Sequence, residues 1–341
     1  MTALEQSIAN YLTHRMPEAG GVSVVSLARI HGGASRETYR VRIKSEKDGE
    51  RGVIVRRDPV STLIETEREV EFAAYRSFMD SDVPVPRALF LERELEWLER
   101  PFFVMEEVEG CTAASILAAD PYGAHRQKIG EQFYAILGRI AKRDVASSDL
   151  SRCVSAPAAN AAWSRELTKW EQVIDEDELE PEPILRAAIR WLRRHTPPPA
   201  QRVAIVHGDY RTGNFLFDSD GVIRAVLDWE MAHLGDPLED LAWALDPLWS
   251  LDRTHPGGML TRKDAIAVWE KFSGLRADPQ ALAWWSMFAS LKGAAIWISS
   301  AKEFQAGSNL DPVMAFSGLY CLPFHHQRLA ELLLARGMAA A

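Results

Sequence analysis

The pattern of hydrophobic and polar positions changes character several times along the chain. Apolar residues recur at helical spacing over residues 3–13, which predicts a helix close to the N-terminus. Residues 22–30, 38–43 and 52–56 are rich in β-branched side chains and bounded by Gly, Asp and Lys, which predicts strands of an antiparallel sheet. Helical spacing returns over residues 62–79 and predicts an amphipathic helix after the sheet.

The rest of the chain is predicted to be mainly helical from residue 113 onward. Helical periodicity covers residues 127–142, 160–173 and 183–195, and the prolines that follow end this region because proline cannot continue a helix. A short apolar strand is predicted at 203–206. The tail, 260–341, is helical and rich in aromatic residues, which at this spacing are usually core, although the same helices could wall an apolar pocket.

The polar segment His207-Gly208-Asp209-Tyr210-Arg211-Thr212-Gly213-Asn214 follows that strand and has the spacing of a phosphotransferase loop. Protein-kinase catalytic loops place a base Asp two residues after a His, and a metal-binding Asn five residues after the Asp. Asp209 and Asn214 occupy these positions. A predicted hairpin over 215–227 should fold Asp228 back beside Asn214, as the second metal ligand. A simple surface turn is the alternative, because Gly, Asp and Asn favour turns.

Composition and charge are those of an ordinary soluble protein and exclude several classes. The chain has 341 residues, 47% hydrophobic and 26% charged, and its net charge of −9 argues against binding to a nucleic-acid backbone. Three scattered cysteines suit a reducing cytoplasm rather than a disulfide framework. The N-terminus does not read as a signal peptide, and no apolar run is expected to approach the roughly 20 residues that span a bilayer.

Four segments together resemble a known family. They resemble the aminoglycoside phosphotransferase-like enzymes of the protein-kinase-like superfamily, and they are residues 32–39, 101–110, 207–214 and 226–242. More narrowly, they resemble the branch related to the kinase-like domain fused to some acyl-CoA dehydrogenases. The likeness covers most of residues 25–250.

This resemblance implies an α+β, bilobal protein-kinase-like fold. Its N-lobe, residues 1–105, is an antiparallel sheet with a helix. A hinge follows at 106–110, and the larger C-lobe, 111–341, is mainly helical. The catalytic loop lies in the C-lobe, and acceptor-binding helices are expected at about 113–198 and 260–341.

The resemblance also implies nucleotide-binding residues in the N-lobe and the hinge. Gly33 and Ser35 lie in a small-residue turn, where backbone N–H groups can approach phosphates. Arg56 stands where kinases carry a strand Lys and can grip phosphate bidentately, whereas Arg57 is expected to be a solvated charge at the strand end. Among the helix glutamates, Glu71 is favoured over Glu67 and Glu69 as the partner of Arg56. The backbones of Glu106 and Val108 are expected to bind adenine.

Further residues of the C-lobe have two possible roles each. Arg211 is expected to stabilise the transferring phosphoryl group, with a structural salt bridge as the alternative. His207 is expected to shape the loop by packing and hydrogen bonding rather than to carry protons. Asp236 and Asp240 are interpreted as structural. The acidic run 175–180 is interpreted as a solvated loop, although it could attract a cationic acceptor.

The sequence therefore predicts a cytoplasmic kinase that uses ATP and Mg²⁺ to phosphorylate a hydroxyl of a small molecule. Trp229-Glu230 replaces the Phe-Gly that follows the metal-binding Asp of protein kinases, and no Ala-Pro-Glu element is present where a peptide would dock. A catalytically inactive nucleotide-binding module is the alternative. Neither nucleic acid nor membrane is an expected partner. The identity of the acceptor, the choice of ATP over GTP and the oligomeric state stay open.

Overall fold

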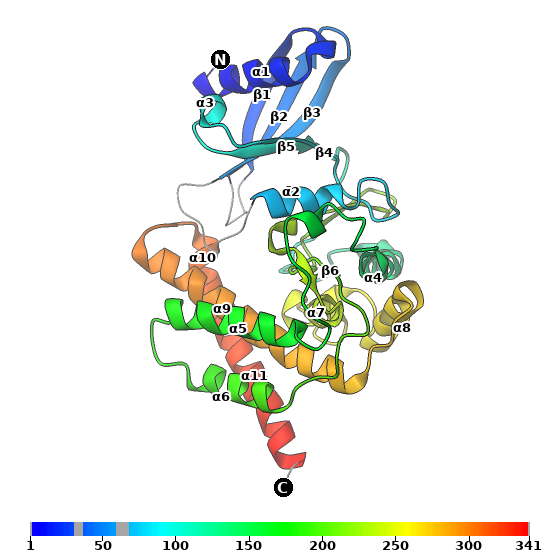
Figure 1. Ribbon diagram of the computed structural model, residues 1–341, viewed down its shortest axis with the longest axis vertical. Coiled ribbons are helices and arrows are strands. Elements are labelled where there is room, and N and C mark those ends of the chain that lie inside the picture. The colour runs from blue at the N-terminus through cyan, green and yellow to red at the C-terminus, as the bar shows by residue number, and fades with distance from the viewer. Residues whose placement is uncertain (1, 31–36, 59–67, 340–341) are drawn as a thin grey trace.

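A computed structural model describes residues 2–30, 37–58 and 68–339, and these form two lobes joined at one side (Figure 1). The N-terminal helix α1 (Ala3–Arg15) begins with a capping box, in which the Thr2 hydroxyl accepts from the Glu5 N–H and the Glu5 carboxylate accepts from the Thr2 N–H. Its apolar face, with Ile8 and Leu12, is buried against the sheet. The helix predicted near the N-terminus is confirmed.

The N-lobe sheet has five antiparallel strands in the order β1-β2-β3-β5-β4. The strands are β1 (Val22–Ile30), β2 (Glu37–Ser45), β3 (Gly49–Arg57), β4 (Ala88–Glu92) and β5 (Phe102–Glu106). On β3, Arg56 lies opposite Thr38 of β2 and Phe103 of β5, so it occupies the centre of the sheet. The three strands predicted before residue 57 are confirmed.

Helix α2 (Arg68–Arg76) lies between the sheet and the C-lobe (Figure 1). Phe72 packs edge-on against Phe103 of β5, with 5.9 Å between ring centroids. The helix predicted over 62–79 is confirmed for this central part, and α2 ends at Arg76 in a series of turns. Residues 62–67 lie outside the described residues. Because α2 faces both lobes, its side chains can connect them.

The C-lobe is built from helices around two small two-stranded sheets, of which only β7–β8 is a hairpin. Strands β6 (Ala204–Val206) and β9 (His233–Gly235) pair with each other, and β7 (Phe215–Phe217) pairs with β8 (Ile223–Val226). The longer helices are α4 (Arg126–Lys142), α5 (Ala162–Asp177), α6 (Pro183–Arg194), α8 (Arg262–Ser273), α9 (Pro279–Ala306) and α11 (Leu322–Ala339), with short α7 (Leu238–Ala244) and α10 (Pro312–Phe316). The fold is therefore α+β, as the sequence predicts.

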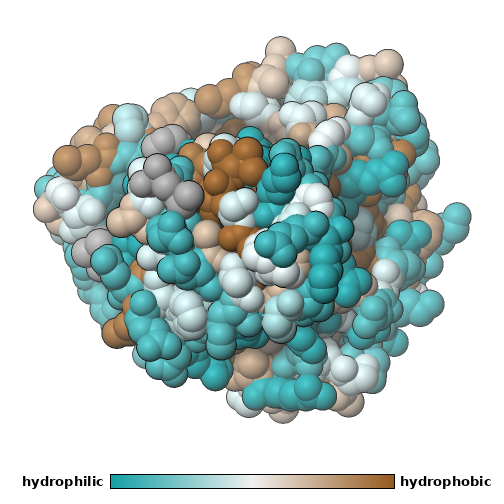
Figure 2. All heavy atoms as spheres, turned by 90° about the horizontal axis from the view of Figure 1, so that it is seen from above, coloured by the Kyte–Doolittle hydropathy of each residue, from teal (hydrophilic) through white to brown (hydrophobic). Residues whose placement is uncertain are grey.

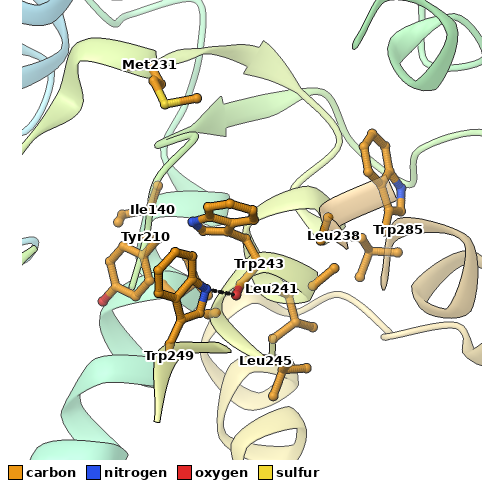
Figure 3. Packing of buried hydrophobic residues seen from close by; sticks show 14 of the residues in the cluster. Ile140, Tyr210, Met231, Leu238, Leu241, Trp243, Leu245, Trp249 and Trp285 are labelled. Carbon is orange, nitrogen blue, oxygen red and sulfur yellow. Dashed lines mark hydrogen bonds between the residues drawn. The ribbon is translucent and has the colours of Figure 1, made fainter. Parts of the chain in front are cut away.

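Helix α9 forms the centre of the C-lobe, and α5, α7 and α11 pack against it. Its length and mean hydropathy of 1.2 would suffice to cross a membrane, so the expectation that no segment comes close was wrong for this helix. However, 83% of that window is buried inside the lobe, as in the core helices of soluble proteins. Trp284, Trp285 and Phe288 are almost completely buried, which confirms the core interpretation of these aromatic residues. Figure 3 shows Trp285 in this core, near Leu238.

The acidic run 175–180 differs in part from its interpretation as a solvated loop. Its first three residues form the last turn of α5, which extends four residues beyond the predicted end. Arg186 of α6 contacts Asp175 and Glu178, and Lys302 of α9 contacts Asp177 at 2.7 Å. These ion pairs compensate much of the negative charge, so the run holds three helices together.

The surface seen from above the N-lobe is largely hydrophilic (Figure 2). Hydrophobic atoms gather in a hollow near the middle of this face, surrounded by polar side chains. Exposed hydrophobic residues also occur in the C-lobe, at Phe316, Leu319 and Tyr320 after α9, and at Leu117 and Leu251. Exposed apolar side chains that cluster in this way mark binding surfaces more often than scattered ones do.

Candidate active site

The segment 207–214 connects β6 to β7, and its first residue holds it in shape. The His207 ring is fully buried, its Nε2 lies 2.9 Å from the Leu227 carbonyl, and its Nδ1 accepts from the Asp209 N–H at 3.1 Å. Nε2 therefore carries the proton. Burial lowers the pKa of His207, although neighbouring carboxylates oppose the shift. The expected packing and hydrogen-bonding role of His207 is confirmed.

Two backbone N–H groups of the loop are satisfied by one buried carboxylate. Asp240 accepts from the N–H of His207 at 2.6 Å and from that of Gly208 at 2.9 Å. Gly208 has φ +85°, and a Cβ there would lie 2.4 Å from the Met231 carbonyl oxygen, so no other residue fits. Asp236 instead accepts from the Leu238 N–H and the Trp285 indole. The sequence did not say which aspartate holds the loop, and the structure identifies Asp240.

Asp209 is surrounded by hydrogen-bond donors. Arg211 Nε lies 3.0 and 3.1 Å from its two carboxylate oxygens, and Asn214 Nδ2 donates to Oδ2 at 2.7 Å. The indole N–H of Trp243 donates to Oδ1 at 2.8 Å. These contacts hold the carboxylate in one orientation at the edge of the loop, where a reacting hydroxyl would need it.

The hairpin β7–β8 brings Asn214 and Asp228 together, as predicted from its length. Phe215 pairs with Val226, and the Leu227 N–H donates to the Asn214 carbonyl at 2.8 Å. Asp228 has a left-handed backbone with φ +65°, which a non-Gly residue adopts only where its surroundings require it. Its N–H donates to the Tyr75 hydroxyl of α2 at 2.9 Å. This backbone conformation is a strained feature of the kind that clusters at functional sites.

Arg56 connects the two lobes through buried ion pairs. Its guanidinium lies 3.0 Å from Glu71 on α2, 3.0 Å from Asp228 and 3.7 Å from Glu230. Burial alone would raise the pKa of Asp228, but the Arg56 charge holds this pKa below its usual value. The structure therefore pairs Glu71 with Arg56, as the sequence favoured. Glu69 instead contacts Arg93 at 2.8 Å.

Arg57 was predicted to be a solvated charge, and this prediction was wrong. The side chain is buried on the opposite side of β3, where it contacts Glu37 at 2.6 Å and donates to the Leu98 carbonyl at 3.2 Å. Arg100 reaches the same carboxylate at 3.0 Å. Alternation along the strand places Arg57 away from Arg56. The sequence does not show that this side of the sheet is covered by α1 and by the short helix α3 (Leu95–Leu98).

Arg211 contacts the carboxylate that it was expected to assist. In addition to the Asp209 contacts, its guanidinium lies over the Trp249 ring, 4.9 Å from the centroid. This is the salt bridge that the sequence left as the alternative. Contact between Arg211 and a phosphate stays a prediction.

The remaining predicted nucleotide-binding residues are placed only in part. Gly33 and Ser35 lie outside the described residues. Glu106 ends β5 opposite Val53, and its N–H donates to the Arg87 carbonyl at 3.0 Å. Val108 follows in the chain between the lobes. Adenine binding by the backbones of Glu106 and Val108 stays a prediction.

Two residues at the site were missed by sequence reasoning. Trp243 contacts Asp209 directly, and Lys292 of α9 donates to the Gly208 carbonyl at 2.6 Å and to Glu239 at 2.8 Å. Lys292 is the only charged residue between Asp278 and Lys302, which was an available signal. A single Lys in an apolar helix must find a buried partner because an unpaired buried charge is very costly.

The donor set fits a magnesium ion. Asn214 uses its amide nitrogen on Asp209, which leaves its amide oxygen as a ligand, and Asp228 supplies a carboxylate whose side chain is 30% exposed. Carboxylate and amide oxygens, completed by water and substrate phosphates, are the ligands that Mg²⁺ prefers. Asn214 and Asp228 are therefore the residues that would hold the ion.

Comparison with known proteins agrees with this geometry. The family model of the phosphotransferase enzyme family matches residues 26–285. Mouse acyl-CoA dehydrogenase family member 10 is 28% identical over 225 residues, which is 64% of this chain and 20% of that protein. The chain thus spans about a fifth of the length of this relative.

Solved structures show the same fold. A Ralstonia eutropha protein named for the aminoglycoside phosphotransferases superposes with a TM-score of 0.75 at 20% identity, covering 97% of this chain and 98% of that one. A mutant of aminoglycoside phosphotransferase APH(4)-Ia, in a complex with AMP-PNP and hygromycin B, has a TM-score of 0.61 at 16% identity and 96% and 98% coverage. Choline kinase LicA from Streptococcus pneumoniae has a TM-score of 0.62 at 14% identity and 96% and 99% coverage.

The fold is thus the bilobal, kinase-like fold predicted from the sequence. The family model covers about three quarters of the chain, including Arg56, the segment 207–214 and Asp228. The chain belongs to the phosphotransferase enzyme family.

Proposed function

We propose that this protein transfers the γ-phosphate of ATP, with Mg²⁺, to a hydroxyl group of a small molecule. The observation that carries the proposal is the convergence of Asp209, Asn214, Asp228 and Arg56 at the junction of the lobes. Phosphoryl transfer needs little covalent chemistry from the protein, because positioning and charge stabilisation supply most of the catalysis. This set of residues supports both requirements.

Each residue has a distinct role in this proposal. Asp209 orients the acceptor hydroxyl and accepts its proton, while Asn214 and Asp228 hold the metal. When bound, Mg²⁺ neutralises charge on the phosphate oxygens. Arg56 and Arg211 contact the phosphates, with Glu71 fixing Arg56. Gly33 and Ser35 cover the phosphates, and the backbones of Glu106 and Val108 bind the adenine.

A groove in the C-lobe supports an acceptor with an apolar body. It is lined mainly by Ile116, Leu248, Leu251, Phe316, Tyr320 and Phe324. Leu248 directly precedes Trp249, over which Arg211 lies, so the groove begins near the catalytic loop. Cys321 also lines it; burial raises the pKa of this thiol to about 11, and the Arg211 charge opposes the shift.

The charges of this groove favour a neutral or anionic acceptor over a polycationic one. Arg253 is the charged residue among the described residues that line it, and no Asp or Glu is among them. A polyamine sugar would need carboxylates there to replace its lost hydration. We therefore propose an alcohol with a hydrocarbon or aromatic body as the acceptor.

We also propose that the protein acts in the cytoplasm, on a small molecule rather than on nucleic acid or a membrane. The described cysteines Cys111, Cys153 and Cys321 are all free thiols, which suits a reducing compartment. The net charge of −9 disfavours a phosphate backbone as the partner.

The test is transfer of labelled γ-phosphate from ATP and Mg²⁺ to a panel of acceptors that includes apolar alcohols, amino alcohols, sugars and aminoglycosides. Asp209→Asn should reduce transfer to a small residual rate and leave nucleotide binding nearly intact. Asp220→Asn makes the same chemical change at an exposed turn of the β7–β8 hairpin and should retain activity.

Two results would count against the proposal. Equal turnover by Asp209→Asn and the wild type would remove Asp209 from its role. Nucleotide binding without transfer to any acceptor would instead favour the alternative, a catalytically inactive nucleotide-binding module.

A further inference from the structure

Trp243 is placed to act on the proposed base, and no role has been assigned to it so far. It lies in the last turn of α7, is 1% exposed, and directs its indole N–H at Asp209 Oδ1 from 2.8 Å. An indole is a donor only, so this contact is its one hydrogen bond from the side chain. A buried indole N–H aimed at a carboxylate fixes one oxygen of that carboxylate.

The ring is held from several sides. Trp249 packs against it with 4.9 Å between ring centroids, and the Trp249 indole donates to the Trp243 carbonyl at 2.8 Å (Figure 3). The Lys292 ammonium lies 5.2 Å from the ring centroid. Because these neighbours are themselves buried, the indole cannot turn away from Asp209 without disturbing the core.

Lys292 connects this ring to the backbone of the catalytic loop. The same ammonium donates to the carbonyl of Gly208, the residue before Asp209, and is neutralised by Glu239. A cation over the face of an indole is attracted by the ring electrons and strengthens its N–H as a donor. One buried cation therefore supports both the peptide that carries Asp209 and the donor that orients its carboxylate.

The other donors to Asp209 have competing tasks. Under the proposed function, on which this inference rests, Arg211 also serves the phosphates and Asn214 also serves the metal. Trp243 has no such second ligand. The Trp243 indole donates to Oδ1 of Asp209, whereas Asn214 donates to the other carboxylate oxygen, Oδ2.

We propose that Trp243 is a positioning residue for Asp209, supported from behind by Lys292. Through this contact the carboxylate keeps its orientation while nucleotide and acceptor bind. The contribution should appear in the chemical step and not in the affinity for either substrate, because Trp243 acts only on the base.

The experiment compares Trp243→Phe with Trp285→Phe, in the full chain, with ATP, Mg²⁺ and whichever acceptor of the panel above the wild type phosphorylates. Phe keeps a ring but removes the donor. Trp285 is the matched control because it is equally buried and its indole donates to another buried carboxylate, Asp236, at 3.1 Å. Trp243→Phe should lower kcat roughly ten- to a hundredfold, the range for a hydrogen bond to a charged group, with both KM values within about twofold. Trp285→Phe should retain kcat.

Two further measurements separate a positioning role from general damage. In an Asp209→Asn background, Trp243→Phe should have no further effect on residual turnover, because the two changes act through one group. In ¹⁵N-tryptophan-labelled protein, the indole N–H resonance that disappears in Trp243→Phe should move in Asp209→Asn, whereas the Trp285 resonance should not.

Three results would overturn the inference: unchanged kcat in Trp243→Phe, an equal fall in Trp285→Phe, or additive losses in the double variant. A wild-type protein without any transfer activity would instead defeat the proposed function. In that case the resonance measurement would still show whether the contact exists, so the two failures are distinguishable.

Discussion

Replacing Lys292 with Met should destabilise the protein more than most single substitutions do. The ammonium is 1% exposed and its partner Glu239 is 2% exposed, with 2.8 Å between them. Burial alone would lower the pKa of Lys292, but Glu239 raises it, so the pair is charged. Met keeps the length and the apolar contacts of the side chain and removes the charge, so the variant isolates the electrostatic contribution.

The magnitude follows from what remains after the substitution. Removing one member of a buried ion pair costs about 3–5 kcal/mol. Glu239 would keep His233 at 3.2 Å, which favours the lower end of that range, about 3 kcal/mol. The Gly208 carbonyl would also lose a donor, which adds about 1 kcal/mol. We therefore expect the free energy of unfolding to fall by about 3–4 kcal/mol.

The assay is urea unfolding followed by far-UV circular dichroism, with Lys302→Met as the control. Lys302 is on the same helix and also pairs with a carboxylate at 2.7 Å, but its side chain is 42% exposed, so its loss should cost no more than about 1 kcal/mol. The double variant Lys292→Met with Glu239→Gln should recover part of the loss, because it no longer buries an uncompensated carboxylate. Equal destabilisation by Lys292→Met and Lys302→Met would refute the reasoning.

Two other variants test the loop and its surroundings. Gly208→Ala should abolish soluble expression or activity, since a Cβ would lie 2.4 Å from the Met231 carbonyl oxygen; a variant with normal activity and unfolding midpoint would contradict this geometry. Burial alone would lower the pKa of His233, but the carboxylates of Glu166 and Glu239 raise this pKa above 6.5. Protonated His233 therefore contributes its full stabilisation below pH 6.5, and this stabilisation is lost as the pH rises through the folded-state pKa. In His233→Gln, the free energy of unfolding should therefore fall less steeply with pH above 6.5 than in the wild type. An unchanged pH dependence would contradict the assignment.

The features that the sequence predicted well have local signals. Strands β1, β2 and β3 follow from β-branched runs, and the hairpin that carries Asp228 follows from two short apolar runs around a turn. The pairing of Arg56 with Glu71 was predicted from the family resemblance, which supplies the positions of the strand cation and of the helix glutamate. Each of these inferences depends on residues close in sequence or on a motif with fixed spacing.

The features that the sequence could not supply depend on contacts between distant segments. Arg57 and Glu37 are 20 residues apart, and the burial of their pair depends on α3, which contributes the Leu98 carbonyl. Lys292 is 84 residues from the Gly208 carbonyl that it supports, and Trp243 is 34 residues from Asp209. Trp243 and Lys292 lie in helices that are buried on almost every side, so the sequence pattern does not say which buried group each one meets.

These distant contacts change how the site should be understood. The motif residues Asp209, Asn214 and Asp228 could be recognised because their chemistry and spacing are shared across a superfamily. Their orientation in this protein depends on α7 and α9, which supply Asp240, Trp243 and Lys292. Under the proposed function, a substitution in α9 is therefore expected to alter turnover without touching nucleotide or acceptor, because that helix carries Lys292, which donates to the Gly208 carbonyl.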